Sequence, residues 1–150
     1  MIETQRLRIH IASQEEMERI IEMEPDEILK TAYQEMLQGC LDHPEQWVWY
    51  AIWIIEDREG KCVGDLSFKG LNPNGSAEIG YGISEEFRNR GFATEAVDAA
   101  VKWAMEQPGI KYIEAETDPD NIASQRVLAK CGFVPSGVVG EEGPRFIKNY

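Results

Sequence analysis

A chain of 150 residues with 43% hydrophobic and 28% charged residues has the composition of a globular domain, not of a disordered segment. Its formal net charge of −12 argues against nucleic-acid binding, which needs a basic surface. Its first residues lack the basic and apolar regions of a signal peptide, and its longest apolar run, residues 47–55, is too short to span a bilayer. We therefore expect a single domain, residues 1–150, that is cytoplasmic and binds neither nucleic acid nor membrane.

The negative charge is unevenly distributed along the chain. The first 60 residues contain 14 acidic and 5 basic side chains, whereas the remainder contains 13 acidic and 10 basic ones. Solubility alone explains such a surplus. The alternative is that the first part of the chain attracts a cationic partner while the second part accepts an anionic one.

The cysteines predict neither disulfides nor a metal site. Cys40, Cys62 and Cys131 are odd in number, widely spaced and without a CxxC motif, so we expect buried, reduced thiols. The two histidines, His10 and His43, add no metal-ligand spacing, and no metal is expected. Cys131 is a poor candidate nucleophile, because the predicted helix C-terminus at this position raises the pKa of a thiol.

The first third of the chain predicts a strand, two helices and a second strand. Residues 4–11 alternate as in an edge strand, and Ser13 with Glu16 forms a capping box that begins a helix. Residues 47–55 are aromatic and β-branched on both alternating sets, which predicts a strand covered on both faces. Between them, residues 27–41 predict a second helix with an apolar face made of Ile28, Leu29, Ala32, Met36 and Leu37.

The middle of the chain predicts a β-meander followed by a helix. Turn signals at residues 57–60 and 72–75 delimit strands over residues 61–70 and 77–83. The segment after Gly91 has helical periodicity, and its predicted buried face consists of Ala96, Val97, Ala100, Val101, Ala104 and Met105.

The last third predicts a strand, a helix and a hairpin. A right-handed crossover places residues 111–117 parallel to the last strand of the meander. Asn121 is the predicted N-cap of the next helix and Gly132 the C′ residue of its Schellman ending, before an antiparallel hairpin over residues 134–150. The predicted fold class is therefore α/β with a mixed sheet, in the order β-α-α-β-β-β-α-β-α-β-β, with helices on both faces.

The junction between the strand 77–83 and the following helix is the main candidate for function. A helix N-terminus carries unpaired backbone donors and roughly half a positive charge, so it attracts a phosphate. Gly91 permits close approach of a ligand to the backbone, and Arg88 and Arg90 add mobile positive charge. The structural alternative is an ordinary tight connection with two solvated arginines.

Four motifs at defined positions resemble a known family. They are R-x-x-G-x-A at residues 88–93, N-x-x-S at 121–124, K-C-G-F at 130–133 and T-x-R-L at 4–7. Together they resemble the GCN5-related N-acetyltransferases (GNAT), in particular the branch with the ribosomal-protein N-terminal acetyltransferases of RimJ/RimL type. The resemblance covers nearly the whole chain. It implies a GNAT-like acyl-CoA N-acyltransferase fold with a splayed mixed sheet, and an enzyme that transfers the acetyl group of acetyl-CoA to a primary amine by direct attack.

The resemblance also implies where acetyl-coenzyme A binds. The turn before the helix would hold the pyrophosphate, and the strand 77–83 would separate from the strand 111–117, leaving a gap for the pantetheine arm. A backbone N–H in this strand would polarise the thioester carbonyl, an interaction worth roughly 2.7–4 kcal/mol in comparable sites. The implied cofactor-binding residues are Tyr81, Gly82, Ile83, Arg88, Asn89, Arg90, Gly91, Phe92, Ala93, Thr94, Asn121 and Ser124.

The catalytic assignments follow from the same resemblance. A protonated amine must lose a proton before it attacks, and a carboxylate takes that proton directly or through water. Glu116 matches a glutamate that some family members use as the base, and Glu78 is the other candidate. Ser124 stands in the neighbourhood of the proton donor, with helix capping as its structural alternative. Many relatives have a tyrosine seven residues after the asparagine, but here that residue is Leu128, so a tyrosine donor is not expected at that position.

The expected acceptor is an amine-bearing small molecule or a peptide N-terminus. The early helices and Trp47 are expected to form its pocket, which would favour a cationic amine through Glu22, Glu24, Glu27 and Glu35. A non-catalytic acyl-CoA-binding sensor or partner module is the alternative function. A homodimer is a further expectation, since members of this family often form dimers.

Overall fold

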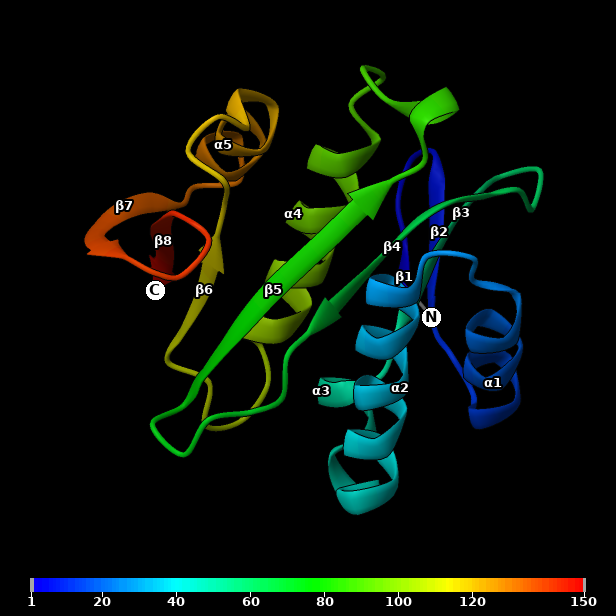
Figure 1. Ribbon diagram of the computed structural model, residues 1–150. Coiled ribbons are helices and arrows are strands. Elements are labelled where there is room, and N and C mark those ends of the chain that lie inside the picture. Colours follow the sequence, from blue (N-terminus) through cyan, green and yellow to red (C-terminus); the bar gives the residue numbers. More distant parts are fainter. Residues whose placement is uncertain (1, 150) are drawn as a thin grey trace.

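One mixed sheet of eight strands organises residues 2–149, the part of the chain that this computed structural model describes (Figure 1). Its strand order is β1-β2-β3-β4-β5-β6-β8-β7, and every neighbouring pair is antiparallel except β5 and β6, which are parallel. The predicted α/β class and the predicted crossover are thus confirmed, while the predicted strand end at Tyr150 lies outside the described residues. The elements are β1 Ile2–Glu3, β2 Leu7–Ile11, α1 Gln14–Met23, α2 Glu27–Asp42, the 3-10 turn η1 Pro44–Gln46, α3 Trp47–Tyr50, β3 Trp53–Asp57, β4 Cys62–Phe68, β5 Ser76–Ile83, the 3-10 turn η2 Glu85–Phe87, α4 Phe92–Met105, β6 Tyr112–Glu116, α5 Ile122–Lys130, β7 Val134–Val139 and β8 Pro144–Asn149.

The helices cover both faces of the sheet and bury one apolar cluster on each. On one face, α1 and α2 contribute Met17, Tyr33 and Cys40 to a cluster that includes Ile52. On the other face, α4 packs across β2, β5 and β6, and all six side chains of its predicted apolar face are buried. α5 joins the second cluster through Leu128. No helix of the described part of the chain is long and apolar enough to cross a membrane.

Two helix ends contain the hydrogen bonds that the sequence predicts. At the start of α1, Ser13 Oγ accepts from the Glu16 amide at 3.2 Å, and the Ser13 amide donates to Glu16 Oε1 at 3.1 Å. At the end of α5, the Phe133 amide donates to the Leu128 carbonyl at 2.9 Å, and Gly132 adopts a positive φ of 89°. Both the capping box and the Schellman ending are therefore confirmed.

The prediction of one strand over residues 47–55 is wrong. This segment begins as the helix α3 and becomes the strand β3 only at Trp53. The reason is that Trp47 and Trp49 pack into different clusters, on opposite faces of the sheet, whereas a strand would place both on the same face. The Trp47 indole also donates to the Ala12 carbonyl at 3.0 Å, which a helical turn allows. Packing here overrides the β propensity of aromatic residues.

The predicted apolar face of α2 is wrong in its first turn. Ile28 and Leu29 are 85% and 40% exposed. Tyr33 and Cys40 are buried instead, with Leu37 between them at helical spacing. Ala32 is exposed as well, whereas the predicted Met36 and Leu37 do pack against this cluster, so the prediction fails only in the N-terminal half of the helix.

Two smaller expectations are also wrong. The first predicted strand is not the edge of the sheet, because β1 pairs with the outer side of β2. Cys62 is exposed, since it begins β4 beside the hairpin turn, whereas Cys40 and Cys131 are buried as expected. All three cysteines are free thiols.

β5 and β6 pair along only part of their length. The pairing runs from Ser76 with Tyr112 to Glu78 with Glu114, while β5 continues as far as Ile83. Figure 1 shows the two strands diverging beyond this point. The backbone groups of the unpaired part of β5 are available to another extended chain. The splayed sheet implied by the family resemblance is thus present.

Candidate active site

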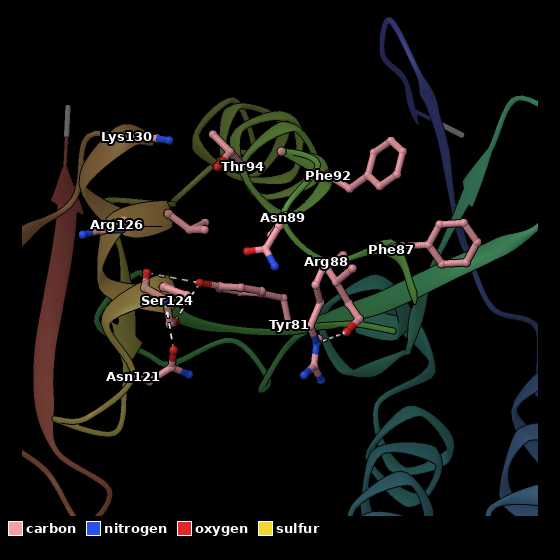
Figure 2. A pocket seen from close by; sticks show the side chains of 16 residues that line it. Tyr81, Phe87, Arg88, Asn89, Phe92, Thr94, Asn121, Ser124, Arg126 and Lys130 are labelled. Carbon is pink, nitrogen blue, oxygen red and sulfur yellow. Dashed lines mark hydrogen bonds between the residues drawn. The ribbon is translucent and has the colours of Figure 1, made fainter. Parts of the chain in front are cut away.

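Two cavities meet at the diverging edge of β5. The first, of about 600 Å³, lies between the N-terminal turn of α4 and the helix α5, and we refer to it as the α4–α5 cavity (Figure 2). The second, of about 840 Å³, lies between α2, β4 and β5, and we refer to it as the α2 cavity. Tyr81, Gly82 and Ile83 line both of them. A molecule bound in one cavity therefore meets a molecule bound in the other at this three-residue segment.

The turn that leads into α4 leaves its backbone donors free. No group of the described residues accepts a hydrogen bond from the amides of residues 89–94, and the first helical bond runs from Glu95 to Gly91 at 3.1 Å. Asn89 and Gly91 adopt positive φ angles of 63° and 81°. Such left-handed residues within a turn direct successive N–H groups into a concavity that binds anions.

Arg6 supports this turn from the N-terminal segment. Its Nη1 donates to the Arg90 carbonyl at 2.7 Å, its Nε donates to Glu95 Oε1 at 2.8 Å, and its guanidinium lies 4.5 Å from the centre of the Phe92 ring. The Thr4 hydroxyl donates to the same carboxylate. Burial alone would raise the pKa of Glu95, but the hydrogen bonds from Thr4 and Arg6 hold this pKa below its ordinary value. The N-terminal motif thus acts on a turn that lies far from it in sequence.

Cationic side chains from α5 line the opposite wall of the α4–α5 cavity. Arg126 and Lys130 lie one helical turn apart on this wall (Figure 2). Arg88 also lines the cavity, and its Nε donates to the Ile83 carbonyl at 3.0 Å. Arg90 does not line the cavity, and its guanidinium lies 5.6 Å from the centre of the Phe87 ring. Every other residue expected to bind the cofactor lines this cavity.

Ser124 and Tyr81 form a pair of hydroxyl groups at the junction of the cavities. Their oxygens are 2.8 Å apart, and Figure 2 shows this bond crossing from β5 to α5. The Ser124 amide also donates to Asn121 Oδ1 at 3.0 Å, so Ser124 takes part in the helix cap while its hydroxyl remains free for the Tyr81 pair. Burial raises the pKa of Tyr81, although the hydrogen bond with Ser124 opposes this effect. Tyr81 is therefore a neutral phenol that is able to donate a proton.

Glu78 and Glu116 line neither cavity. Both carboxylates bind Arg145, whose Nη2 is 2.8 Å from Glu78 Oε1 and whose Nη1 is 2.7 Å from Glu116 Oε1, and Glu114 binds the same guanidinium at 3.0 Å. The Arg145 hydrogen bond lowers the pKa of Glu116. Burial would raise the pKa of Glu78, but Lys69 and Arg145 lower it below its ordinary value. Weakened basicity and a bound guanidinium make both groups poor proton acceptors.

The α2 cavity has an acidic wall. Glu24 and Glu35 line it, as expected, whereas Glu22, Glu27 and Trp47 do not. The lining includes an additional carboxylate, Asp65 on β4, together with Tyr33, Met36, Tyr50 and Lys69.

Comparisons with known proteins agree with this architecture. The sequence model of one protein family, described as the acetyltransferase (GNAT) domain, matches residues 3–134. Among solved structures, a spermidine N-acetyltransferase from Vibrio cholerae, in complex with CoA and spermine, superposes with a TM-score of 0.75 at 18% identity, covering 97% of this chain and 96% of that one. At this identity the likeness concerns the fold. The chain belongs to the GNAT family of acetyltransferases.

Two curated relatives add sequence similarity. The uncharacterized N-acetyltransferase YjdG of Bacillus subtilis is 33% identical over 84 residues, which are 55% of this chain and 50% of the relative. The ribosomal-protein-serine acetyltransferase of Escherichia coli is 27% identical over 89 residues, which are 59% of this chain and 50% of the relative. The matched region thus spans about half the length of these relatives.

Proposed function

We propose that residues 1–150 act as a single acetyltransferase domain that moves the acetyl group of acetyl-coenzyme A to a primary amine. One observation carries this proposal: residue 89 and residues 91–94, whose amides are free, line a cavity that joins an acidic second cavity at Tyr81, Gly82 and Ile83. The first cavity suits an anionic cofactor and the second a cationic amine. Their junction is where a group would pass from one to the other.

The residues of the α4–α5 cavity fit the parts of acetyl-coenzyme A. The amides of residues 89–94 are suited to a pyrophosphate, because they add unpaired donors to the positive end of the α4 dipole. Arg126 and Lys130 supply charge for further phosphate oxygens. The unpaired edge of β5 would hydrogen-bond the amides of the pantetheine arm in the manner of an added strand.

Acetyl-coenzyme A supplies a thioester, whose carbonyl carbon accepts the amine and whose sulfur leaves as a thiolate. The backbone amide of Ile83, which the β4–β5 register directs away from β4, would stabilise the developing oxyanion. The Ser124 hydroxyl, with Tyr81 behind it at 2.8 Å, would donate a proton to the sulfur. Burial raises the pKa of Cys131 to about 11, so this thiol is not activated for nucleophilic attack, and direct transfer is the consistent route.

The relatives support an amine as the acceptor. One acts on a ribosomal-protein serine, and a structural neighbour is a spermidine N-acetyltransferase. Either a peptide N-terminus or a small cationic amine suits the acidic wall formed by Glu24 and Glu35.

The proposal is tested by binding and turnover. Acetyl-CoA at 100 times its Kd is expected to stabilise the fold by about 2.7 kcal/mol, which raises Tm by about 5–10 °C for a chain of this size. Coenzyme A release is then measured with spermidine and with a peptide that begins with serine. Binding without turnover on a broad panel of amines would instead indicate a non-catalytic sensor, and the absence of any Tm shift would refute both functions.

Arg6→Ala is expected to weaken acetyl-CoA binding about tenfold, because the turn loses its bonds to the Arg90 carbonyl and to Glu95. Arg8→Ala is the matched control, since within residues 2–149 the one ion pair that Arg8 forms is with the exposed Glu3, at 3.6 Å. Calorimetric titration of both variants makes the comparison. Equal Kd values for Arg6→Ala and Arg8→Ala would show that the turn keeps its conformation without Arg6.

A further inference from the structure

Asp65 lies opposite Gly82 in the β4–β5 ladder, at the junction of the two cavities. The two residues are direct partners in the antiparallel register, and directly opposed Cβ positions are about 4.5–5.5 Å apart on the same face. Both residues line the α2 cavity. A Cβ built on Gly82 meets no atom within 4 Å, so the space between the Asp65 side chain and the backbone of Gly82 is open.

The surroundings of Asp65 differ from those of Glu78 and Glu116. Its Oδ2 accepts from the Tyr33 hydroxyl at 2.7 Å, and no cationic side chain of the described residues forms an ion pair with it. Lys69, which lines the same cavity, is bound to Glu78 at 2.9 Å. The carboxylate thus faces the cavity without a positive partner, which favours a cationic ligand.

Burial, more than its ionisable neighbours, makes Asp65 a stronger base than an exposed aspartate. Burial raises its pKa, the Tyr33 hydrogen bond opposes that effect, and the negative charge of Glu24 raises the pKa further. Cys62, the first residue of β4, is a further ionisable neighbour: the residue as a whole is exposed, but partial desolvation of its sulfur raises the pKa of the thiol, which favours the neutral form. Burial and Asp65 also raise the pKa of Tyr33, which therefore remains a hydrogen-bond donor.

We propose that Asp65, positioned by Tyr33, receives the ammonium group of the acceptor and takes the proton whose loss makes the amine nucleophilic. This role rests on the proposed function and adds a catalytic residue that is absent from the family motifs in this chain. It requires a carboxylate that faces the acceptor, lies close to the thioester and is not neutralised by a cation. Asp65 meets these three conditions, and Glu78 and Glu116 do not.

The protons and bonds of the step balance as follows. The ammonium gives one proton to the Asp65 carboxylate, which later releases it to solvent. The amine nitrogen then forms a bond to the acetyl carbon, and the bond from that carbon to sulfur breaks. The sulfur takes a proton from the Ser124–Tyr81 hydroxyl pair. The nitrogen loses a second proton to solvent as the amide forms, and a proton from solvent restores the hydroxyl pair. The products are the N-acetylated amine, coenzyme A and one released proton.

The test compares Asp65→Asn with the matched variant Asp98→Asn, whose side chain lies on α4 outside both cavities. For Asp65→Asn, kcat/KM for spermidine or for a serine-initiated peptide is expected to fall about 100- to 1,000-fold, while the Kd of acetyl-CoA and Tm stay unchanged. Asp98→Asn is expected to retain full activity. A kcat/KM for Asp65→Asn within about threefold of the wild type would overturn the assignment.

The pH dependence provides a second readout that a purely structural role would not affect. The acidic limb of kcat/KM reports the pKa of the base in the free enzyme. Tyr33→Phe removes a hydrogen bond that lowers the pKa of Asp65, so this limb is expected to move to higher pH. In Asp65→Asn the limb disappears. If the acidic limb is identical in the wild type, Tyr33→Phe and Asp65→Asn, the proposal is contradicted, even if the two variants are less stable than the wild type.

Failure of this proposal is distinguishable from failure of the proposed function. If the wild-type protein turns over an amine and Asp65→Asn does so equally well, only the role of Asp65 is lost. If no amine is acetylated, spermidine binding to the coenzyme A complex is measured by calorimetry for the wild type and for Asp65→Asn. If the wild type binds spermidine and Asp65→Asn does not, the ammonium site at Asp65 is supported while the proposed transferase activity is refuted. Binding that is absent, or equal in both proteins, refutes the ammonium site as well.

Discussion

Gly82→Val is expected to lower kcat/KM for acetyl transfer at least about 100-fold while the fold remains intact. The added methyl groups would occupy the open space above Gly82, where the proposed function brings the acceptor to the thioester, and a displacement of about 1 Å at a reacting centre is sufficient for a loss of this size. The fold tolerates the change because no atom lies within 4 Å of the new Cβ and valine has a high strand propensity. Steady-state kinetics and a thermal melt measure the two effects.

Gly82→Ala serves as the graded comparison. Its single methyl group fills much less of the junction, so its activity is expected to lie between those of the wild type and Gly82→Val. The Kd of acetyl-CoA is expected to change less than kcat/KM in both variants, because the new side chain points into the α2 cavity and away from the amides of residues 89–94. If Gly82→Val is fully active, the acceptor does not reach the thioester at this junction.

Charge reversal on α5 is expected to produce the largest change in cofactor affinity. Arg126→Glu combined with Lys130→Glu changes the charge along one wall of the α4–α5 cavity by four units. A loss of about 3 kcal/mol, or about 100-fold in the Kd of acetyl-CoA, is expected at low salt. At physiological ionic strength the loss is expected to be smaller, because the screening length is then only about 8 Å.

The matched control is Lys61→Glu combined with Lys102→Glu, which changes the net charge equally at two positions outside both cavities. This protein is expected to bind acetyl-CoA with little change. If the two double variants lost the same affinity, net charge would be the cause, and the α5 wall would have no specific part in binding.

The part of the site that depends on local chain geometry could be predicted from the sequence. A glycine-containing turn between a strand and a periodic helix predicts bare amides at the helix N-terminus, and Asn121 is recognisable as a cap from its type and spacing. Arg126 was missed, although it lies three residues after Ala123 and four before Lys130 on one helical face. This three- and four-residue spacing on the predicted helix was a signal from which Arg126 could have been identified.

The part that depends on contacts between distant elements could not be predicted. Arg145 binds glutamates on β5 and β6, and its role follows from strand register, which the sequence of β8 does not specify. The position of Asp65 opposite Gly82 depends in the same way on the β4–β5 register. The helical start of residues 47–55 was missed because local propensity does not reveal which of two clusters each tryptophan joins.

The guanidinium of Arg145 has a consequence for how the diverging strands behave. It binds Glu78, the last residue of β5 that pairs with β6, and both Glu114 and Glu116 of β6. The fork in the sheet is therefore clamped at its vertex by a single cation shared among three strands. The gap between the strands is therefore held at a fixed width before a ligand binds. The pantetheine arm of the proposed cofactor would enter it without separating the strands, so little of its binding free energy would be lost to a conformational change of the protein.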